Sequence, residues 1–404
     1  MVDLSEKKVL ILGAGRGQKG LYKAANKLGI KTIAATLPDN NPPCLPLADE
    51  VCYVNILNPD EVESKTESLI FDGVATCCLD KGLKALGRLC NKYSVPGYSE
   101  NSAELCNNKF LMKRKFTETN VSTAPFKVIK NEKELLNSIN DLGGFPLIIK
   151  ATDLAGSKGI YKVFNQGDAI EGFNKAIADT KKDYVIIEKL LKGNEFGAQA
   201  FIQNGKLLFI MPHGDILFHG ATDVPIGHYV PLEVSEDIKS QITLETEKAI
   251  KAVGLDNCAV NIDFIEENGK VYVLELSGRI GANGLPELVS AHYGIDYYEM
   301  VLLAALGIQV DELWSKRKPG KAAVSRMIIS PDKSGKLENI EVDLTKIKDL
   351  FDFQLFVQPG QEIHRFENSN HCIGQFTLLS DSISECKNNA EDFFQTISNQ
   401  IKTH

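Results

Sequence analysis

The sequence predicts a mixed α/β and α+β protein with a parallel sheet at its amino end, a larger central unit and a small carboxy-terminal α+β unit. Over roughly residues 1–101, apolar runs alternate with amphipathic stretches, which is typical of a parallel sheet flanked by helices. Over 102–310 the strands also come in pairs, with a hairpin signal at Asn268 and Gly269. Over 311–404, glycine-marked strands end in a helix. We therefore divide the chain into these three units.

The amino-terminal unit begins with the apolar run KVLIL at residues 8–12, which a glycine-rich turn and an amphipathic stretch follow. A strand, a tight turn and a helix in this order open a Rossmann-like parallel sheet. The remaining elements of this unit are expected as strands at 32–35, 51–54 and 73–77, and as helices at 21–28, after residue 60 and through residue 89.

The central unit is expected to start with a helix from about residue 102 and to continue with alternating strands and helices. The next expected elements are strands at 126–129, 147–150, 159–163 and 184–188, with helices at 132–142 and 167–178. Paired strands are expected at 196–202 and 206–212, before an irregular, histidine-rich stretch to about 231. The later elements of this unit are helices at 235–253 and 286–306, and strands at 257–266 and 270–277. The helix that ends the carboxy-terminal unit is expected at 383–401.

Charge and composition exclude several classes of protein. Lys and Arg number 45 against 53 Asp and Glu, for a net charge of -8, and no long basic run occurs, so we expect no nucleic-acid partner. The longest apolar run, near residues 300–310, is about half of what a bilayer crossing needs, so we expect no membrane association. The amino terminus shows no secretory hydrophobic segment, and the nine cysteines form no CxxC pair. These features indicate a cytoplasmic protein with reduced thiols, without a disulfide framework or a zinc site.

The turn from Gly15 to Gly20 has the GxGxxG spacing of a dinucleotide site. The next strand ends in Ala34, Ala35 and Thr36, where a dinucleotide site would carry an acidic residue for a ribose hydroxyl. We favour a turn that lets the helix pack closely on the strand. An NAD-dependent oxidoreductase stays as the alternative.

A lysine at the end of a buried strand is a candidate for phosphate binding. Lys150 ends the apolar run 147–150, and burying an ammonium costs several kcal/mol unless an anion lies nearby. The loop that follows contains Gly156, Ser157 and Gly159, whose N–H groups and hydroxyl could converge on phosphate oxygens. A plain glycine hairpin between two strands is the alternative.

The apolar run at 185–188 is interpreted as an edge strand that enters a connector. Free backbone groups at such an edge could pair with an adenine ring, and Glu195 could accept hydrogen bonds from both ribose hydroxyls. Surface glutamates around a turn would explain the same residues.

Two acidic residues on neighbouring strands indicate a metal site. A three-residue turn at 268–270 would set Asp263 opposite Glu275, whereas a two-residue turn would send them to different faces, and we assume the longer turn. Opposed carboxylates repel unless a cation lies between them, and oxygen ligands suit Mg²⁺. A solvated polar face is the alternative. Apolar neighbours indicate that the opposite face is buried, which favours the metal: Ile262, Phe264, Leu274 and Leu276.

Together these features resemble the ATP-grasp superfamily over about residues 8–310, and within it the carboxylate-amine ligases, which include amino-acid ligases and purine-pathway enzymes. The resemblance implies an ATP-grasp central domain with a mobile lid at about 120–190. It implies ATP contacts at Lys109, Lys150, Gly156, Ser157, Gly159, at the adenine hinge Glu188, Lys189, Leu190 and Leu191, and at Glu195 and Leu274.

The same resemblance implies Mg²⁺, or Mn²⁺ in its place, at Asp263, Glu275 and Ser277. The family usually carries Asn where this chain has Ser277. Whether one or two metal ions bind is therefore left open. The catalytic residues that the resemblance implies are Lys150 and Arg279. Arg279 is expected to face the acyl phosphate. On the substrate side, Gly281 and His228 are implied. His228 resembles a histidine that some amino-acid ligases place at the substrate carboxylate, and a solvated loop histidine is the alternative.

The function implied is an ATP-dependent, ADP-forming ligase that activates a carboxylate as an acyl phosphate and joins it to an amine, with an amino acid as a candidate substrate. The partners expected are therefore a small-molecule carboxylate and an amine, and a homodimer is a hypothesis. Besides the oxidoreductase, a non-catalytic ATP-binding protein stays as an alternative.

Overall fold

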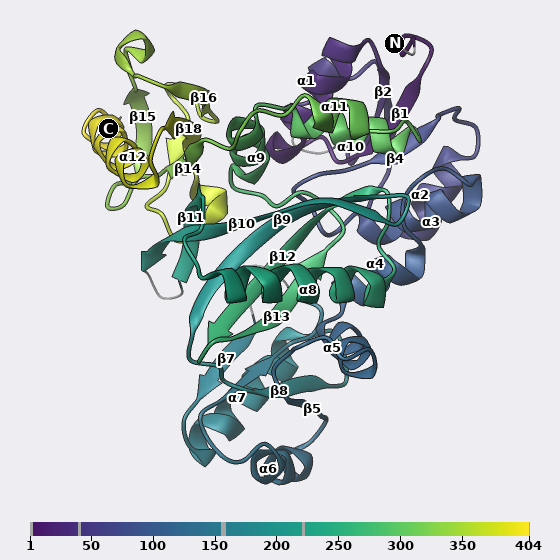
Figure 1. The fold of residues 1–404 in the computed structure, drawn as a ribbon, viewed down its shortest axis with the longest axis vertical. Coiled ribbons are helices and arrows are strands. Elements are labelled where there is room, and N and C mark those ends of the chain that lie inside the picture. The colour runs from purple at the N-terminus through teal and green to yellow at the C-terminus, as the bar shows by residue number, and fades with distance from the viewer. Residues whose placement is uncertain (1–2, 39–41, 155–158, 220–222, 404) are drawn as a thin grey trace.

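The computed structural model describes residues 3–38, 42–154, 159–219 and 223–403 (Figure 1). Four hydrogen-bonded sheets form the framework. The parallel sheet at the amino end lies at the upper right of Figure 1, the carboxy-terminal elements lie at the upper left, and a small sheet lies below a large central one. None of the helices described is long and apolar enough to span a bilayer.

The amino-terminal sheet is parallel, as predicted, with the strand order β3-β2-β1-β4. Its strands are β1 (Lys8–Leu12), β2 (Lys31–Thr36), β3 (Glu50–Tyr53) and β4 (Gly73–Ala75), and its helices are α1 (Lys19–Leu28), α2 (Pro59–Thr66) and α3 (Leu83–Tyr93). The glycine-rich turn after β1 is closed by Gln18, whose side chain accepts from the Gly15 N–H and donates to the Cys77 carbonyl. The turn therefore packs against β4.

The small sheet has the order β5-β8-β6-β7 and carries two helices. Its elements are β5 (Phe126–Ile129), β6 (Leu147–Lys150), β7 (Ile160–Val163), β8 (Val185–Lys189), α6 (Glu132–Asp141) and α7 (Gln166–Asp179). The prediction of an edge strand at 185–188 was wrong. β8 pairs with β5 on one side and β6 on the other, because β5 returns antiparallel to it.

The large sheet has eight strands in the order β13-β12-β9-β10-β11-β14-β18-β16. These are β9 (Asn194–Gln203), β10 (Lys206–His219), β11 (Asp223–Val230), β12 (Cys258–Glu267), β13 (Lys270–Ser277), β14 (Ala322–Ile328), β16 (Leu350–Leu355) and β18 (Gly374–Ser380). The helix α8 (Glu236–Val253) crosses one face of this sheet (Figure 1). The carboxy-terminal strands extend the central sheet through the β11–β14 pair. The domain boundaries stay predictions.

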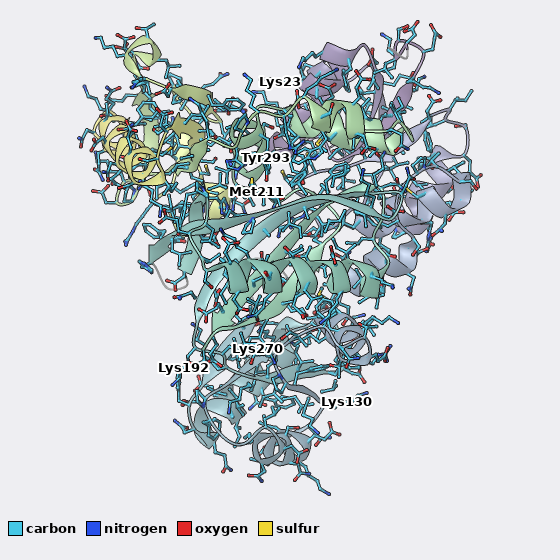
Figure 2. The ribbon with its side chains drawn as sticks, in the orientation of Figure 1. Lys23, Lys130, Lys192, Met211, Lys270 and Tyr293 are labelled. Atoms are coloured by element: carbon cyan, nitrogen blue, oxygen red, sulfur yellow. The ribbon has the colours of Figure 1, made fainter. Side chains whose placement is uncertain are left out.

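The remaining elements surround this sheet. Helices α9, α10 and α11 lie between the large sheet and the amino-terminal sheet, and α12 packs on β14 and β18. Their bounds, with those of the short strands of the third sheet, are α9 (Leu285–Tyr293), α10 (Tyr297–Ala305), α11 (Asp311–Ser315), α12 (Ile383–Ser398), β15 (Gly335–Asn339), β17 (Glu362–Ile363) and β19 (Lys402–Thr403). In Figure 2, Met211 of β10 and Tyr293 of α9 lie in this interior, where both belong to one apolar cluster.

Three predicted segments differ in the structure. The helix expected from residue 102 is two helices, α4 (Glu100–Asn107) and α5 (Lys109–Glu118), because the Asn108 side chain caps the second. The helix at 286–306 is also broken, at Gly294, which adopts a left-handed φ of 63°. The irregular stretch to residue 231 consists largely of β10 and β11.

The β12–β13 hairpin corrects one step of the sequence argument. Its turn has two residues, Asn268 and Gly269, both with positive φ, so the assumption of a three-residue turn was wrong. A β-bulge nevertheless restores the expected pairing. Phe264 pairs with Val273, and beyond the extra residue Leu274 the register shifts, so that Asp263 faces Glu275.

The two faces of this hairpin differ in polarity. Ile262 and Phe264 are fully buried and Leu276 nearly so, and all three belong to the cluster that also contains apolar residues of α8. Leu274 is only half-buried because it is the bulged residue. The burial predicted for this face is therefore confirmed for three of its four residues, and the acidic residues occupy the other face.

Gly193, next to Lys192 (labelled in Figure 2), holds the β8–β9 connector against β12. A Cβ atom there would overlap the backbone carbonyl of Glu266, which cannot rotate away. We expect Gly193→Ala to lower the free energy of unfolding by about 2 kcal/mol or more in urea titrations. The matched variant Gly167→Ala, in the first turn of α7 beside only a side chain, should change it by less than about 1 kcal/mol. Equal effects of the two variants would contradict this packing.

Candidate active site

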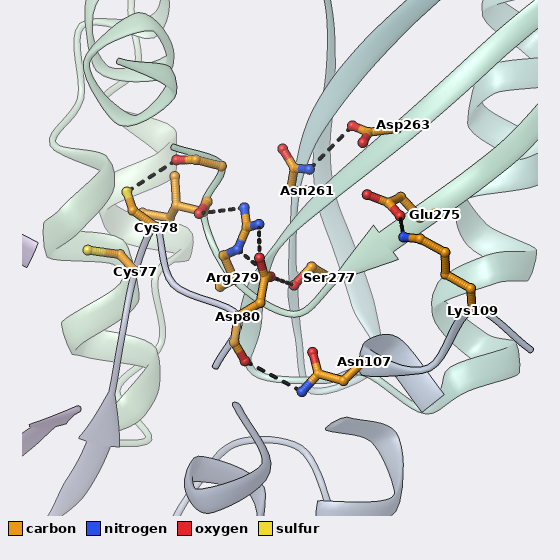
Figure 3. Close-up of polar contacts among 12 residues, drawn as sticks. Cys77, Cys78, Asp80, Asn107, Lys109, Asn261, Asp263, Glu275, Ser277 and Arg279 are labelled. Carbon is orange, nitrogen blue, oxygen red and sulfur yellow. Dashed lines mark hydrogen bonds and ion pairs between the residues drawn. The ribbon is translucent and has the colours of Figure 1, made fainter. Parts of the chain in front are cut away.

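The centre of the candidate site is the acidic pair Asp263 and Glu275 on β12 and β13 (Figure 3). The two residues are direct cross-strand partners, so their side chains leave the same face of the sheet. Lys109, at the start of α5, forms an ion pair with the Glu275 carboxylate. Asn261 donates to the Asp263 carboxylate at 3.4 Å. Both acids therefore have partners within the protein.

The charges of this pair are strongly perturbed. Burial, with Glu275 and Asp215 nearby, raises the pKa of Asp263 to about 8. Lys109 instead holds the pKa of Glu275 below its ordinary value. The protonated form of Asp263 is thus favoured in this arrangement, and a divalent ion would favour its ionised form. The adjacent carboxylates and the Asn261 amide oxygen are the donor types that Mg²⁺ prefers, so these residues fit that ion.

A second group of charges lies at the end of the small sheet. Glu188 on β8 is buried between Lys113, at 3.1 Å, and Lys150, at 3.3 Å. Burial raises the pKa of Glu188, but the two ammonium groups outweigh it and hold the pKa below its ordinary value. Two cations against one anion leave a net positive charge in a nearly dry site. A phosphate group is the kind of ligand that would balance it.

Arg279, assigned to the acyl phosphate, is held by Asp80 in the loop after β4 (Figure 3). Its Nε and Nη2 atoms donate to the two carboxylate oxygens of Asp80 at 2.8 and 2.7 Å, a bidentate pair that fixes the guanidinium plane. The hydroxyl of Ser277 donates to Asp80 at 2.7 Å. Ser277 thus touches the partner of Arg279, and its role as a metal ligand stays a prediction.

An amide pair connects the metal residues to the substrate side. The side chain of Gln199 on β9 donates to Asn261 at 2.6 Å and accepts from the Gly281 N–H at 3.0 Å. A Cβ atom at Gly281 would lie 2.5 Å from the Asn261 carboxamide oxygen, so a larger residue there would displace the Asn261 side chain. Gly281, which we assigned to the substrate, is therefore connected to Asp263 through the side chains of Gln199 and Asn261.

The phosphate loop is only partly described. Gly156 and Ser157 lie outside the described residues. Gly159, at its end, has a φ of 66°, and its carbonyl accepts from the Ala151 N–H at 2.8 Å, which closes the loop at its base. Lys150 immediately precedes this closure.

Fewer residues of the expected adenine hinge have groups free to bind adenine than the sequence analysis predicted. The N–H groups of Lys189 and Leu190 donate to the carbonyls of Pro125 and Pro146, so they are already occupied. Glu188 is committed to the two lysines. The hypothesis of adenine pairing therefore narrows to the connector that contains Leu191, with the exposed Glu195 at its far end.

A cavity of about 350 Å³ lies between the amino-terminal glycine turn and the carboxy-terminal strands. Ala282 and Asn283, which follow Gly281 in the chain, line it. Glu287 of α9 also lines it, and accepts from the Tyr298 hydroxyl at 2.7 Å. Burial and Asp352 raise the pKa of Glu287 to about 7.

His228, assigned to the substrate, lies on β11 within a cluster of His213, Asp215 and His228. Its Nδ1 atom is 2.7 Å from Asp215 Oδ1, and His213 Nδ1 is 3.3 Å from the same oxygen. The alternative of a solvated loop histidine is wrong, since His228 is buried in a strand. Gly197 on β9 leaves room for the His213 ring, and Gly197 is also the strand partner of Asp263.

The sequence analysis missed several residues of the site. Lys113 lies four residues after Lys109 on α5, a spacing that places both on one helix face and could have been noticed. Asp80 follows β4 at the carboxyl end of a parallel strand, where ligands of such sheets commonly bind. Glu287 and His213 carried no signal in the sequence, because only the fold brings them to the cavity and to Asp215.

Comparison with known proteins agrees with this geometry. The sequence model "Phosphoribosylglycinamide synthetase, ATP-grasp (A) domain" matches residues 107–252, and "L-amino acid ligase C-terminal domain 2" matches 327–402. A relative named formate-dependent phosphoribosylglycinamide formyltransferase, from Prochlorococcus marinus (strain NATL2A), is 24% identical over 98% of this chain and 99% of its own.

Two solved structures share the fold over nearly the whole chain. The L-amino acid ligase from Bacillus licheniformis has a TM-score of 0.80 at 20% identity and covers 99% of both chains. The phosphoribosylglycinamide synthetase from Anaerococcus prevotii has a TM-score of 0.86, is 48% identical and covers 98% of both chains. At that identity and coverage the family is shown. The chain belongs to the ATP-grasp superfamily and is a carboxylate-amine ligase of the ADP-forming type.

Proposed function

We propose that this ligase activates a carboxylate as an acyl phosphate and joins it to the amine of an amino acid. The observation that carries the proposal is the direct cross-strand register of Asp263 and Glu275, beside lysines whose charge is only partly balanced. Such a site suits a metal-bound nucleoside triphosphate. Mg²⁺ is the ion proposed here, and Mn²⁺ could use the same oxygen ligands.

Asp263 and Glu275 would hold the ion, which when bound supplies neutralisation of the phosphate charge. Lys150 and Lys109 would turn from their carboxylate partners toward the phosphates, with the loop that contains Gly156, Ser157 and Gly159 as their cover. The connector that contains Leu191 would receive the adenine ring beside Leu274, and Glu195 the ribose.

In the first step an oxygen of the substrate carboxylate attacks the γ-phosphorus, the bond from that phosphorus to the β-phosphate oxygen breaks, and ADP leaves. In the second step the amine nitrogen attacks the acyl carbon, the bond to the phosphate oxygen breaks, and phosphate and one proton are released. Arg279, fixed by Asp80, would face the charge that develops on the acyl phosphate. His228 and Gly281 are proposed to contact the substrate.

The cavity that Glu287 lines favours an ammonium group as the acceptor. Glu287 is a buried carboxyl group on its wall, and it would bind a positive charge. Two basic residues also line the cavity: Lys19, and Arg16, which contacts the carbonyls of Ser369 and Cys372 and the ring of Phe356. The carboxyl group of Glu287 favours an amino acid as the acceptor, whereas the two basic residues would suit a phosphorylated amine.

A second candidate is the formation of phosphoribosylglycinamide. It is favoured by the 48% identity to the synthetase of that name and by the match over residues 107–252. ADP release measured with pairs of amino acids, and separately with the phosphoribosyl substrates, distinguishes the two. Release with pairs of amino acids supports the first candidate, and release that requires glycine together with a phosphoribosyl amine supports the second.

Removal of one charge of the acidic pair should stop turnover. We expect Glu275→Gln to lower substrate-dependent ADP release at least about 100-fold, because a close charge pair contributes on the order of 4 kcal/mol. Circular dichroism should show an unchanged fold. The control Glu247→Gln, an exposed residue of α8 on the opposite side of the sheet, should keep full activity. Turnover of Glu275→Gln at the rate of the unaltered protein would remove the metal assignment.

The acceptor proposal predicts a pH dependence. Because the pKa of Glu287 is raised to about 7, the residue is neutral below that pH and ionised above it. The KM for the amine should therefore fall as the pH rises from 6 to 8. Glu287→Gln should raise this KM about tenfold at pH 8, leave it nearly unchanged at pH 6, and leave the KM for ATP unaltered.

The matched control for this measurement is Glu299→Gln on α10, a half-buried glutamate that does not line the cavity. It should leave both constants unchanged. An amine KM that does not respond to Glu287→Gln at pH 8 would show that the acceptor binds elsewhere.

A further inference from the structure

His213, Asp215 and His228 form a buried cluster on β10 and β11 that the proposed ligase chemistry does not fully use. We call it the histidine cluster. One candidate ligand atom from each of the three residues lies within 4.8 Å of the others. Asp215 pairs with His228 across the two strands, and His213 lies two residues before Asp215, so all three side chains share one face. The cysteine spacing predicted no zinc site, whereas here two strands bring two histidines and a carboxylate together.

The histidine cluster has hydrogen-bonding capacity that the protein does not satisfy. The His213 residue is 2% exposed, and neither of its ring nitrogens makes a hydrogen bond. His228 is 4% exposed, and its Nε2 atom has no partner either. Buried polar atoms are paired in almost all proteins, so two buried imidazole rings that have unpaired nitrogens and lie beside one carboxylate indicate a missing ligand.

We propose that the histidine cluster binds one divalent transition-metal ion through a ring nitrogen of each histidine and a carboxylate oxygen of Asp215. Two imidazoles and one carboxylate are the ligands of many zinc sites, and Zn²⁺ is the ion that fits them. The acidic pair Asp263 and Glu275 offers only oxygen, which suits Mg²⁺. The two sites therefore differ in ligand chemistry although they are neighbours.

The position of the cluster gives such an ion a defined place in the molecule. His213 and Asp263 are both strand partners of Gly197, on either side of β9. Three protein ligands leave a coordination position for water or for an oxygen of a small carboxylate. The ion would also add positive charge next to Asp263. Binding of this ion does not require the ligase function, so the two can be tested separately.

Cobalt titration of the full-length protein tests the site. The chelator-treated protein, without nucleotide and with excess Mg²⁺ to occupy the acidic pair, is titrated with Co²⁺, and the visible absorption of the bound ion is recorded. We expect one Co²⁺ per chain, displaced by Zn²⁺ with loss of the absorption. His213→Asn and His228→Asn should each weaken Co²⁺ binding at least tenfold.

Two variants serve as controls. His219→Asn alters an exposed histidine on the same strand, which pairs with Asp223 at 2.8 Å, and it should bind Co²⁺ as the unaltered protein does. Asp263→Asn should also keep Co²⁺ binding, because Asp263 belongs to the acidic pair and not to the histidine cluster. Binding that survives both cluster substitutions, or that Asp263→Asn abolishes, would overturn the proposal.

A direct spectroscopic measurement keeps the proposal testable if either cluster variant fails to fold. In the unaltered protein labelled with ¹⁵N in its imidazole rings, Zn²⁺ should shift the ring-nitrogen resonances of two histidines and leave that of the exposed His219 in place. No shift on Zn²⁺ addition would mean that Asp215 and His228 form only a hydrogen-bonded pair, and the metal site would be rejected.

Discussion

The structure depends on the opposition of two carboxylates across one β ribbon. Two like charges in direct cross-strand register destabilise a sheet, and the partial burial of Asp263 adds to the cost. The protein tolerates the pair because Lys109 neutralises Glu275 and because the protonated form of Asp263 is favoured. A site that is costly without its ligand is a common property of active centres. A divalent ion would remove the repulsion that the fold imposes.

The basic residues around the acidic pair are also neutralised by neighbours of opposite charge. Each basic residue that we assign to the phosphates has a carboxylate partner: Lys109 has Glu275, Lys150 has Glu188, and Arg279 has Asp80. These partners stabilise the site without nucleotide. Phosphate oxygens would compete for the cations, so nucleotide binding exchanges one set of ion pairs for another. Each of these three cations would thereby have an anionic partner in either condition.

Much of this arrangement could be predicted from the sequence, and the failures have physical reasons. The parallel sheet, the paired strands and the acidic pair follow from apolar periodicity. The two-residue turn was missed because a bulge at Leu274 compensates it, and no sequence pattern marks a bulge. The interior position of β8 depends on β5, which lies more than 50 residues away in the chain. Long-range pairings of this kind also bring His213 beside Asp215 and place Glu287 on the cavity wall.

The central claim is that Asp263 and Glu275 jointly hold the ion that carries the nucleotide. A crystal of the protein grown with Mn²⁺ and a non-hydrolysable ATP analogue, measured near the manganese absorption edge, tests it most directly. An anomalous peak within coordination distance of both carboxylates, in contact with the phosphates, is the predicted result. A peak bound to neither carboxylate, or carboxylates that stay turned away from the bound nucleotide, would contradict the account.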